Sequence, residues 1–531
     1  MKTKRILALL LAGLVATSAV ACKKDGDKTE NEGGAYVQMP EEDEKAKIAA
    51  LSPEEYLEYV VMEKHDLPMY VSAFTDSAKS EYSADSSAKG SVRLTTGDGT
   101  AEFIGAVNPG AVEQYKKLSW LSDIGIEIEA DTTADGLIST PIDLKVNNVH
   151  VIDLILTADT KKEMLFATLP ELNEKAIGIS VPDFAREYAP TLLSYALIDA
   201  LPEGEDTEAL AEKYLAILLE AASNVTKEAD SVTVSEISQD VNCVSFDITP
   251  DDLYNATVKL AETAVDDPAI KAVFEEISDE LYASGGAESF DSVEAMIDAT
   301  YNEFDRQAEN LKKYPELYTI SSDIAVNLYT STDDELIGFE VFSDEYSVLE
   351  CLTAEKDDEF AFVVSAEDFI VEGTGSTEDG KCFMNAEVKA YLDGENAVTV
   401  MTVNVDGIDT ELLEDGFFNG TITVKPGRDF ALSIGQGGDI LAECEAVISF
   451  TQTNLDDANT VITFNYKGKK VLSLDAYGAM KSPSEIVVPT SWYEATNKED
   501  MQKFMQDIDT TTVITNLSEA GILNKLFSFM G

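Results

Sequence analysis

The chain has only two histidines, His65 and His150, and they limit the acid–base and metal chemistry that it could perform. They fall in different expected elements, and neither has a Cys, Asp or Glu at the spacing of a familiar metal-binding motif. A Ser-His-Asp triad would have to use one of the two. Because His150 ends the run LKVNNVH at a turn between strands, the pattern favours a surface or edge role. We therefore predict no metal ligand, no cofactor-binding residue and no catalytic residue.

Other catalytic signatures are also missing from the sequence. It contains no G-x-S-x-G, P-loop or dinucleotide fingerprint. The glycine-rich runs at 373–380 and 435–439 are expected to join strands, so they have no helix N-terminus to bind phosphate. Carboxylates are so abundant that any pair chosen for glycoside hydrolysis would be arbitrary. We expect a protein that is not an enzyme.

The N-terminus carries the strongest chemical signal. Lys2, Lys4 and Arg5 precede an apolar run, and the small residues Ala19-Val20-Ala21 lead to Cys22. This order resembles a bacterial lipobox, which implies cleavage before Cys22 and diacylglycerol, with palmitate-type chains, on its sulfur. The alternative is an ordinary secretory signal followed by a chance cysteine, because position 19 holds Ala where the lipobox pattern prefers Leu.

The lipobox divides the N-terminal region into two predicted parts. Residues 1–21 form a lipoprotein signal peptide, and residues 22–45 form a flexible acidic tether, because 23–34 has no apolar side chain to bury. A tether of this length spans about 25 Å on average. The expected location is the outer face of the bacterial cytoplasmic membrane, with the folded body facing the cell exterior.

The composition excludes several partners. The 531 residues include 100 Asp and Glu against 38 Lys and Arg, which gives a formal net charge of −62. Such a field repels nucleic acid and anionic headgroups. No calcium-loop motif accompanies the acidity, which indicates a solvated surface.

The cysteines after Cys22 are far apart and form no C-x-x-C motif. Two of them lie in strand-like apolar runs, which favours buried thiols, and whether any form disulfides stays open; they are Cys243, Cys351, Cys382 and Cys444.

Two stretches of the chain resemble one another, which indicates an internal repeat. Ser122-Asp123-Ile124 aligns with Ser322-Asp323-Ile324, and Leu137-Ile138 aligns with Leu336-Ile337. The segments 90–181 and 230–366 are then expected to share one order of hairpin, helix and meander. In both segments Pro follows an N-cap residue, Asn108 or Thr249.

Periodicity predicts the remaining elements. We expect strands over 88–107, a meander over 123–181 and a nearly all-strand stretch over 318–480. Expected hairpin turns lie at Asp379-Gly380, Asp393-Gly394, Pro426-Gly427 and Lys467-Gly468. Expected helices lie at 41–63, 110–121, 183–199, 206–228, 250–264, 267–283, 289–313, 497–508 and 515–529.

These elements predict an α+β fold of two related units, each a curved antiparallel meander covered by helices. The first unit would span 46–229, and the second, larger unit would span 230–531 with the C-terminal helices.

The lipobox, the repeated unit and the phrase TLPELNEKAIGISV resemble a group of two-repeat lipoproteins of Gram-positive, clostridial-type bacteria. More remotely, the pattern is similar to the LolA/LppX lipoprotein-carrier fold over about residues 50 to 510. That resemblance implies a hydrophobic cavity for a lipid or a lipid-modified partner, and it carries over no functional residue.

Two functions remain as hypotheses. The first is a membrane-anchored extracytoplasmic lipoprotein that binds a hydrophobic or lipid-like ligand in a groove between sheet and helices. We expect the groove between the 318–480 sheet and helices 250–313 or 497–529, lined by alternating residues such as Ala386, Val388, Ala390, Leu392, Ala397, Met401 and Val403. The alternative is a cell-surface scaffold or protein-interaction module.

Overall fold

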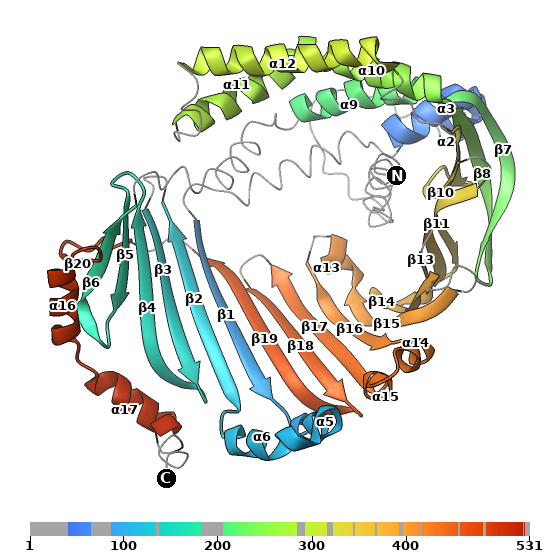
Figure 1. The fold of residues 1–531 in the computed structure, drawn as a ribbon. Helices are drawn as coiled ribbons and strands as arrows, with labels where there is room; N and C mark the ends of the chain where they lie inside the picture. Colours follow the sequence, from blue (N-terminus) through green and yellow to red (C-terminus); the bar gives the residue numbers. More distant parts are fainter. Residues whose placement is uncertain are drawn as a thin grey trace. The chain divides into compact units, whose positions relative to one another are not determined.

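The computed structural model shows a chain in which β-strands predominate (Figure 1). It describes residues 41–64, 86–133, 137–181, 205–283, 292–315, 322–343, 346–366, 369–391, 397–414, 417–454, 457–481, 485–523 and 525. The chain divides into two compact units. Unit 1 comprises 1–81, 190–376 and 393–397, and unit 2 comprises 82–189, 377–392 and 398–531. The units are therefore interleaved along the chain and are not separated at residue 229, where the boundary was expected.

Unit 2 contains a broad antiparallel sheet built from both halves of the chain. Its pairing order is β15-β16-β17-β18-β19-β1-β2-β3-β4-β5-β6, and β20 adds in parallel to β6. The strands of this unit are β1 (Ser86–Thr96), β2 (Asp123–Thr132), β3 (Leu137–Val146), β4 (Val149–Asp159), β5 (Met164–Leu169), β6 (Asn173–Ser180), β14 (Lys381–Tyr391), β15 (Ala397–Asp409), β16 (Asn419–Pro426), β17 (Cys444–Asn454), β18 (Asp457–Tyr466), β19 (Lys469–Lys481) and β20 (Trp492–Glu494).

Short helices pack at the margins of this sheet. Phe103 of α5 makes edge-on ring contacts with Phe464 and Tyr466 of β18. The C-terminal helices α16 and α17 contact β20 and β4. The helices of unit 2 are α5 (Thr100–Val107), the 3-10 turn η2 (Pro109–Ala111), α6 (Val112–Leu118), α13 (Thr410–Glu414), α14 (Arg428–Ser433), α15 (Gly438–Leu441), α16 (Lys498–Asp507) and α17 (Thr511–Glu519).

Unit 1 contains a second run of consecutive antiparallel strands. Their pairing order follows the chain from β7 to β13. The strands are β7 (Ser223–Val234), β8 (Ile237–Ile248), β9 (Ile324–Ser331), β10 (Leu336–Ser343), β11 (Tyr346–Lys356), β12 (Glu359–Ala366) and β13 (Phe369–Glu378). β7 and β8 also contact β11, with which they do not pair, so the run curls on itself. Val232 and Val241 thereby join Leu352 and Ala354 in one buried cluster.

The N-terminal helical segment covers the other face of this run. It consists of α2 (Glu41–Ala49), α3 (Pro53–Glu58) and the π-helical turn η1 (Tyr59–Lys64). Tyr56 and Val60 are 0% and 1% exposed and pack with Val244 of β8 and Leu328 of β9. The Tyr56 hydroxyl donates to Asp334 Oδ1 at 2.5 Å and lies 2.9 Å from Thr330 Oγ1. The Lys227 ammonium lies 3.2 Å from the centre of the Tyr56 ring.

The long helices of unit 1 pack mainly against one another. They are α9 (Glu205–Leu219), α10 (Pro250–Asp266), α11 (Pro268–Ala283) and α12 (Val293–Lys313), and contacts link α10 with α9, α11 and α12 (Figure 1). A capping box at Thr249 and Asp252, followed by Pro250, begins α10. The predicted N-cap at Thr249 is therefore confirmed.

The predicted α+β fold class is wrong. All twenty described strands belong to a single large sheet, and the fold is dominated by that sheet. A helical cover was expected for each meander, but α9–α12 contact mainly each other, and α16 and α17 contact β20 and β4. The described helices within 497–529, α16 and α17, therefore pack at β20 and β4 and not over the 318–480 stretch. Apolar alternation predicts which face of a strand needs cover, and it does not identify the covering element.

Three local predictions also need correction. Residues 100–107 form α5 where strand was expected, because Phe103 reaches aromatic rings more than three hundred residues away. The helix expected over 206–228 ends at Leu219, and β7 begins at Ser223. Pro426-Gly427 makes no hairpin turn, because Gly427 precedes α14. The helix expected at 183–199 and the turn at Asp393-Gly394 lie outside the described residues.

The two similar segments share part of their strand order. In unit 2, β1, the α5–α6 helices and β2 to β5 follow one another, and each consecutive pair of strands is hydrogen-bonded. In unit 1, β8, the α10–α12 helices and β9 to β12 do the same. Ile124 pairs with Leu94, and its aligned residue Ile324 pairs with Ile248. The hairpin expected at the start of each segment is formed by β7 and β8 in the second segment, whereas in the first segment residues 100–107 form α5 in place of the second strand.

Candidate functional site

One face of the unit 2 sheet is apolar across neighbouring strands. Directly paired residues point to the same side of a sheet, so cross-strand rows define its faces. Three such rows run Ala458-Gly478-Gly90-Ile128-Ile142-Leu154, Thr460-Ala476-Val92-Ile126-Leu144-Ile152 and Ile462-Leu474-Leu94-Ile124-Val146. Thr460 is the single polar residue in these rows. We call this surface the apolar sheet face.

The centre of the apolar sheet face is open to solvent. Its large side chains there are 37–44% exposed; they are Val92, Leu94, Ile126, Ile128 and Ile462, together with Met480, which pairs with Ala88 in the adjoining row. Towards the margins the face is packed, because α5 places Phe103 against Phe464 and α17 places Leu517 in the cluster of Val146 and Val151. The exposed part is therefore a strip of aliphatic side chains between two packed margins.

Two paired glycines lie within this strip. Gly90 of β1 pairs with Gly478 of β19. A Cβ added to Gly478 would have no atom within 4 Å, so the space above this residue is open. The neighbouring Ala458 and Ile128 continue the same row. Because glycine has no side chain, the surface of the strip is recessed at these two residues relative to the branched side chains beside them.

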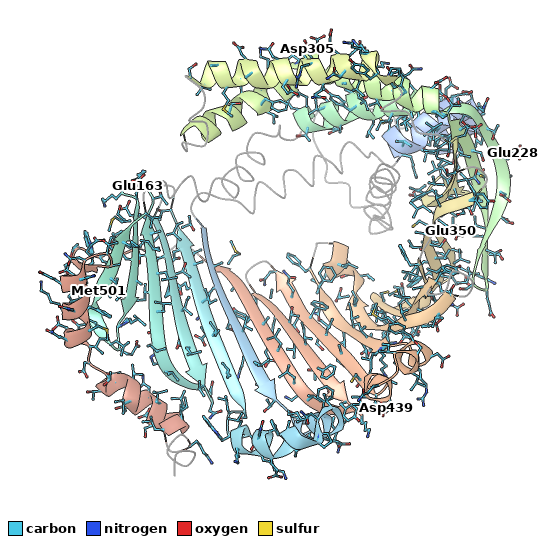
Figure 2. All side chains as sticks on the ribbon, viewed as in Figure 1. Glu163, Glu228, Asp305, Glu350, Asp439 and Met501 are labelled. Atoms are coloured by element: carbon cyan, nitrogen blue, oxygen red, sulfur yellow. The ribbon has the colours of Figure 1, made fainter. Side chains whose placement is uncertain are left out.

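Side chains project from both faces of these strands (Figure 2), and those on the opposite face are polar. Arg93 of β1 donates to Asp123 of β2, and Lys145 of β3 forms an ion pair with Glu127 of β2. Asp143 lies 3.3 Å from the Lys145 ammonium. Strict alternation in β1 to β3 therefore separates an apolar face from a charged one.

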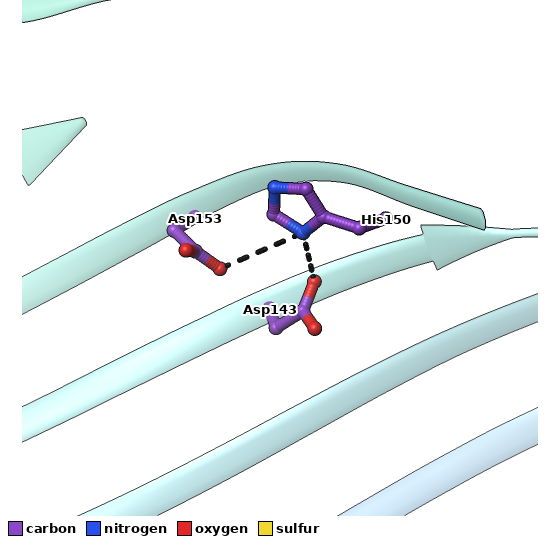
Figure 3. A group of neighbouring side chains, drawn as sticks. All are labelled: Asp143, His150 and Asp153. Atoms are coloured by element: carbon purple, nitrogen blue, oxygen red, sulfur yellow. Dashed lines mark hydrogen bonds and ion pairs between the residues drawn. The ribbon is translucent and has the colours of Figure 1, made fainter. Parts of the chain in front are cut away.

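The charged face carries a group of side chains centred on His150 (Figure 3). Nδ1 of His150 lies 2.6 Å from Asp143 Oδ1 and 3.8 Å from Asp153 Oδ1. Nε2 lies 2.9 Å from Glu171 Oε1. The other oxygen of Glu171 accepts the backbone N–H of Asp153 at 3.0 Å. We call these four residues the His150 cluster.

Local geometry positions the His150 cluster. Asn147 and Asn148, with φ of 49° and 62°, form the tight turn between β3 and β4. This turn sets His150 opposite Lys145 and Asp153 opposite Asp143. Glu171 comes from the turn between β5 and β6, and its side chain is only 9% exposed. Three separate parts of the chain thus meet at one imidazole ring.

The surroundings change the proton affinities in this cluster. Burial opposes protonation of His150, but hydrogen bonds to Asp143 and Glu171 raise its pKa above the ordinary value. Burial and the charge of Glu171 raise the pKa of Asp153. Burial also opposes ionisation of Glu171, whereas the backbone N–H of Asp153 and the His150 ring lower its pKa. The carboxylates therefore favour a cation at the ring.

No pattern in the sequence indicates the His150 cluster. Asp153 follows His150 by three residues, but in a strand that spacing does not place two side chains on one face unless a bulge intervenes. A bulge opposite Leu144/Lys145 does so here. Asp143 and Glu171 come from neighbouring strands and turns, so only the register brings them close.

The other residues that were singled out in the sequence lie outside the His150 cluster or outside the described residues. Cys22 and His65 lie outside the described residues. Cys243, Cys351, Cys382 and Cys444 are free thiols, and burial raises the pKa of each. Among the expected groove residues, Ala386 is 6% exposed and Leu392 is outside the described part. The predicted groove between these residues and helices 250–313 would join elements of both units, and that prediction stays untested.

None of the described helices is long and apolar enough to cross a membrane. Comparison of the chain with protein-family models, with curated proteins and with solved structures finds no match in any of the three.

Proposed function

We propose that the protein is a membrane-anchored extracytoplasmic lipoprotein that binds a hydrophobic, lipid-like ligand on the apolar sheet face. The observation that supports this most is the exposed aliphatic strip at the centre of the unit 2 sheet. Soluble proteins seldom leave contiguous large apolar side chains exposed unless the surface binds something. The lipobox-like sequence ending at Cys22 supports the anchor.

The chemistry of the strip favours an acyl chain over a protein partner. Its exposed large side chains are all aliphatic or thioether, with none of the Trp, Tyr or Arg that dominate protein–protein hot spots. The backbone groups of β1, β2 and β19 are already paired in the sheet. A surface without unpaired backbone hydrogen-bonding groups suits an acyl chain, which has no hydrogen-bonding groups of its own.

Energetics also allow a reversible complex. Burial of about eight ligand methylenes contributes about 6 kcal/mol. Association costs at least about 4 kcal/mol in lost freedom. We therefore expect weak, exchangeable binding of a neutral lipid, because the net charge of −62 disfavours an anionic headgroup.

Binding is tested with the full chain carrying Cys22→Ala and produced without export, so that its own acyl chains cannot compete. The probe is a pyrene-labelled diacylglycerol, titrated by fluorescence and checked by native mass spectrometry. We expect saturable binding of one probe per chain. The double variant Val92→Thr/Ile126→Thr should bind on the order of 10-fold more weakly, since each change removes about 0.7 kcal/mol of apolar contact.

The matched control is Val487→Thr, which makes the same replacement at a residue 78% exposed outside the strip. It should bind the probe like the parent chain. Absence of saturable binding, or equal affinity in the double variant, would contradict lipid binding at this face. The interaction-module hypothesis would then be the one that survives.

The anchor is tested separately by Cys22→Ala in an exporting host. The variant should appear in the medium or remain as an uncleaved precursor, because a diacyl anchor contributes about 0.8 kcal/mol per buried methylene and the acidic body has no attraction to anionic lipid. A cleaved variant that stays on the membrane would exclude the lipobox interpretation.

A further inference from the structure

We propose that the His150 cluster is a binding site for a divalent transition-metal ion, with Zn²⁺ as the representative ion. The ligands would be Nδ1 of His150 and one carboxylate oxygen each from Asp143 and Asp153. These three atoms all lie within 4.8 Å of one another. The site is on the charged face of the unit 2 sheet, so it is independent of the proposed lipid surface.

The distances are close to what zinc requires. Zinc bonds of about 2.0–2.2 Å to N and O in a tetrahedral site place neighbouring ligand atoms roughly 3.3 Å apart. The Nδ1–Asp143 separation of 2.6 Å and the Nδ1–Asp153 separation of 3.8 Å lie on either side of that value. Because no two of the three atoms are more than 4.8 Å apart, side-chain movements on the order of 1 Å would bring them to zinc-binding distances.

Glu171 occupies the supporting position that metal-binding histidines usually have. It holds Nε2 of His150 at 2.9 Å and is nearly buried. A carboxylate on Nε2–H directs the lone pair of Nδ1 towards the metal. Because Glu171 also accepts the backbone N–H of Asp153, it positions two of the three ligands.

The charges around Nδ1 of His150 favour a divalent cation over a single proton at this atom. Asp143, Asp153, Glu171 and Glu127 provide four carboxylates, whereas Lys145 provides one ammonium. Lys145 contacts Oδ2 of Asp143 and leaves Oδ1 towards the ring. The imidazole ligand selects zinc and similar ions over Ca²⁺ and Mg²⁺, which prefer all-oxygen sites. Three protein ligands leave a coordination position for water.

Binding is measured by isothermal titration of Zn²⁺ into the full chain after EDTA treatment. About 0.5 M NaCl and excess Ca²⁺ suppress diffuse binding to the acidic surface. We expect one saturable site, release of protons on binding, and weaker binding as the pH falls and protons occupy Nδ1. His150→Gln should abolish the site, and Glu171→Gln should weaken it 10- to 100-fold.

Asp457→Asn is the control, because it removes one exposed carboxylate from the same unit at the start of β18; its zinc affinity should be unchanged. A second measurement does not depend on the folding of the His150 variant. In the His65→Gln chain His150 is the only histidine, so zinc must shift one imidazole ¹⁵N resonance, that of Nδ1. No saturable site, equal affinity in His150→Gln, or unmoved imidazole resonances would each overturn the proposal.

Discussion

Strands β2 and β9 contain the aligned residues Ile124 and Ile324, yet their apolar faces have different surroundings. Val326 of β9 is 5% exposed, whereas its aligned residue Ile126 of β2 is 37% exposed. The next cross-strand pair on the same face of unit 1 is Val244 and Leu328, and both residues pack under α3 and η1. The corresponding pair in unit 2 is Gly90 and Ile128, and Ile128 is 39% exposed.

The difference shows that the same alternation of apolar and polar residues can produce a covered apolar face, as in unit 1, or an exposed one, as in unit 2. In unit 1 the covering segment is held by polar contacts as well as by packing, since Tyr56 bonds to Thr330 and Asp334. The residue of β2 aligned with Thr330 is Ala130, which has no hydroxyl to offer. Unit 2 thus has the apolar surface without the group that fixes a helix upon it, and glycine replaces Val244. This contrast supports a mobile ligand rather than a docked helix at the strip.

The largest expected effect comes from removing the cover of unit 1. Tyr56→Ala should lower the free energy of unfolding by about 3–5 kcal/mol, because it empties a fully buried site and leaves Asp334 and Thr330 without their partner. Urea unfolding measures the change. Tyr56→Phe keeps the ring and is the control for the hydroxyl alone. A loss under about 1 kcal/mol for Tyr56→Ala would mean that α3 is not the cover of this face.

A second test compares the aligned positions directly. Val326→Thr should cost about 1–3 kcal/mol, because the new hydroxyl is buried without a partner. Ile126→Thr should cost less than about 1 kcal/mol, since residue 126 already contacts solvent. The two single variants are measured by urea unfolding under identical conditions. Equal losses would remove the distinction between a covered and an open face.

The sequence could predict the local elements but not the partners that cover them. Alternation at 124–128 predicted β2, and the turns at Asp379-Gly380 and Lys467-Gly468 are confirmed by positive φ at all four residues. In contrast, β1 is hydrogen-bonded to β19, nearly four hundred residues later. Such pairings depend on packing of the whole chain, and no local pattern encodes them.

The same limit applies to the candidate site. Cys22 could be predicted as a lipidation site because its signal is contiguous in the sequence. The His150 cluster could not, because a bulge and two turns assemble it. The exposed strip was also not predictable, since a strand reads as apolar on one face whether or not that face is covered.

A third test concerns the helices that pack on one another in unit 1. Asp267 accepts from Lys213 at 2.7 Å and from the backbone N–H of Ala269 at 2.9 Å, and its side chain is 4% exposed. Burial opposes its ionisation, but these hydrogen bonds lower its pKa below the ordinary value. Because the folded-state pKa is lowered, the stabilisation exists above the unfolded-state pKa of about 4 and disappears as the pH falls through the folded-state value.

Asp267→Asn should therefore lower stability at pH 7 by about 2 kcal/mol, the contribution of a hydrogen bond to a charged group. Its unfolding free energy should also vary less than that of the parent chain below pH 4. The exposed Asp457→Asn variant is the control and should keep the parent's pH dependence. A pH profile unchanged by Asp267→Asn would show that this carboxylate does not join the helices.

The smallest expected effect on stability is at the glycine pair of the apolar sheet face. In Gly478→Leu the new side chain enters open space in a strand, so the free energy of unfolding should change by less than about 1 kcal/mol, and towards greater stability because glycine weakens strands. The matched change in unit 1 is Gly338→Leu, where the added Cβ would meet the Cys351 carbonyl oxygen at 2.2 Å and the strand pairing would be disrupted.

The side chain introduced by Gly478→Leu should nevertheless reduce binding of the pyrene-labelled diacylglycerol, because it fills the recessed part of the strip. Loss of probe binding without loss of stability would identify this part of unit 2 as a ligand surface, whereas unchanged binding would show that the ligand does not lie over the glycines.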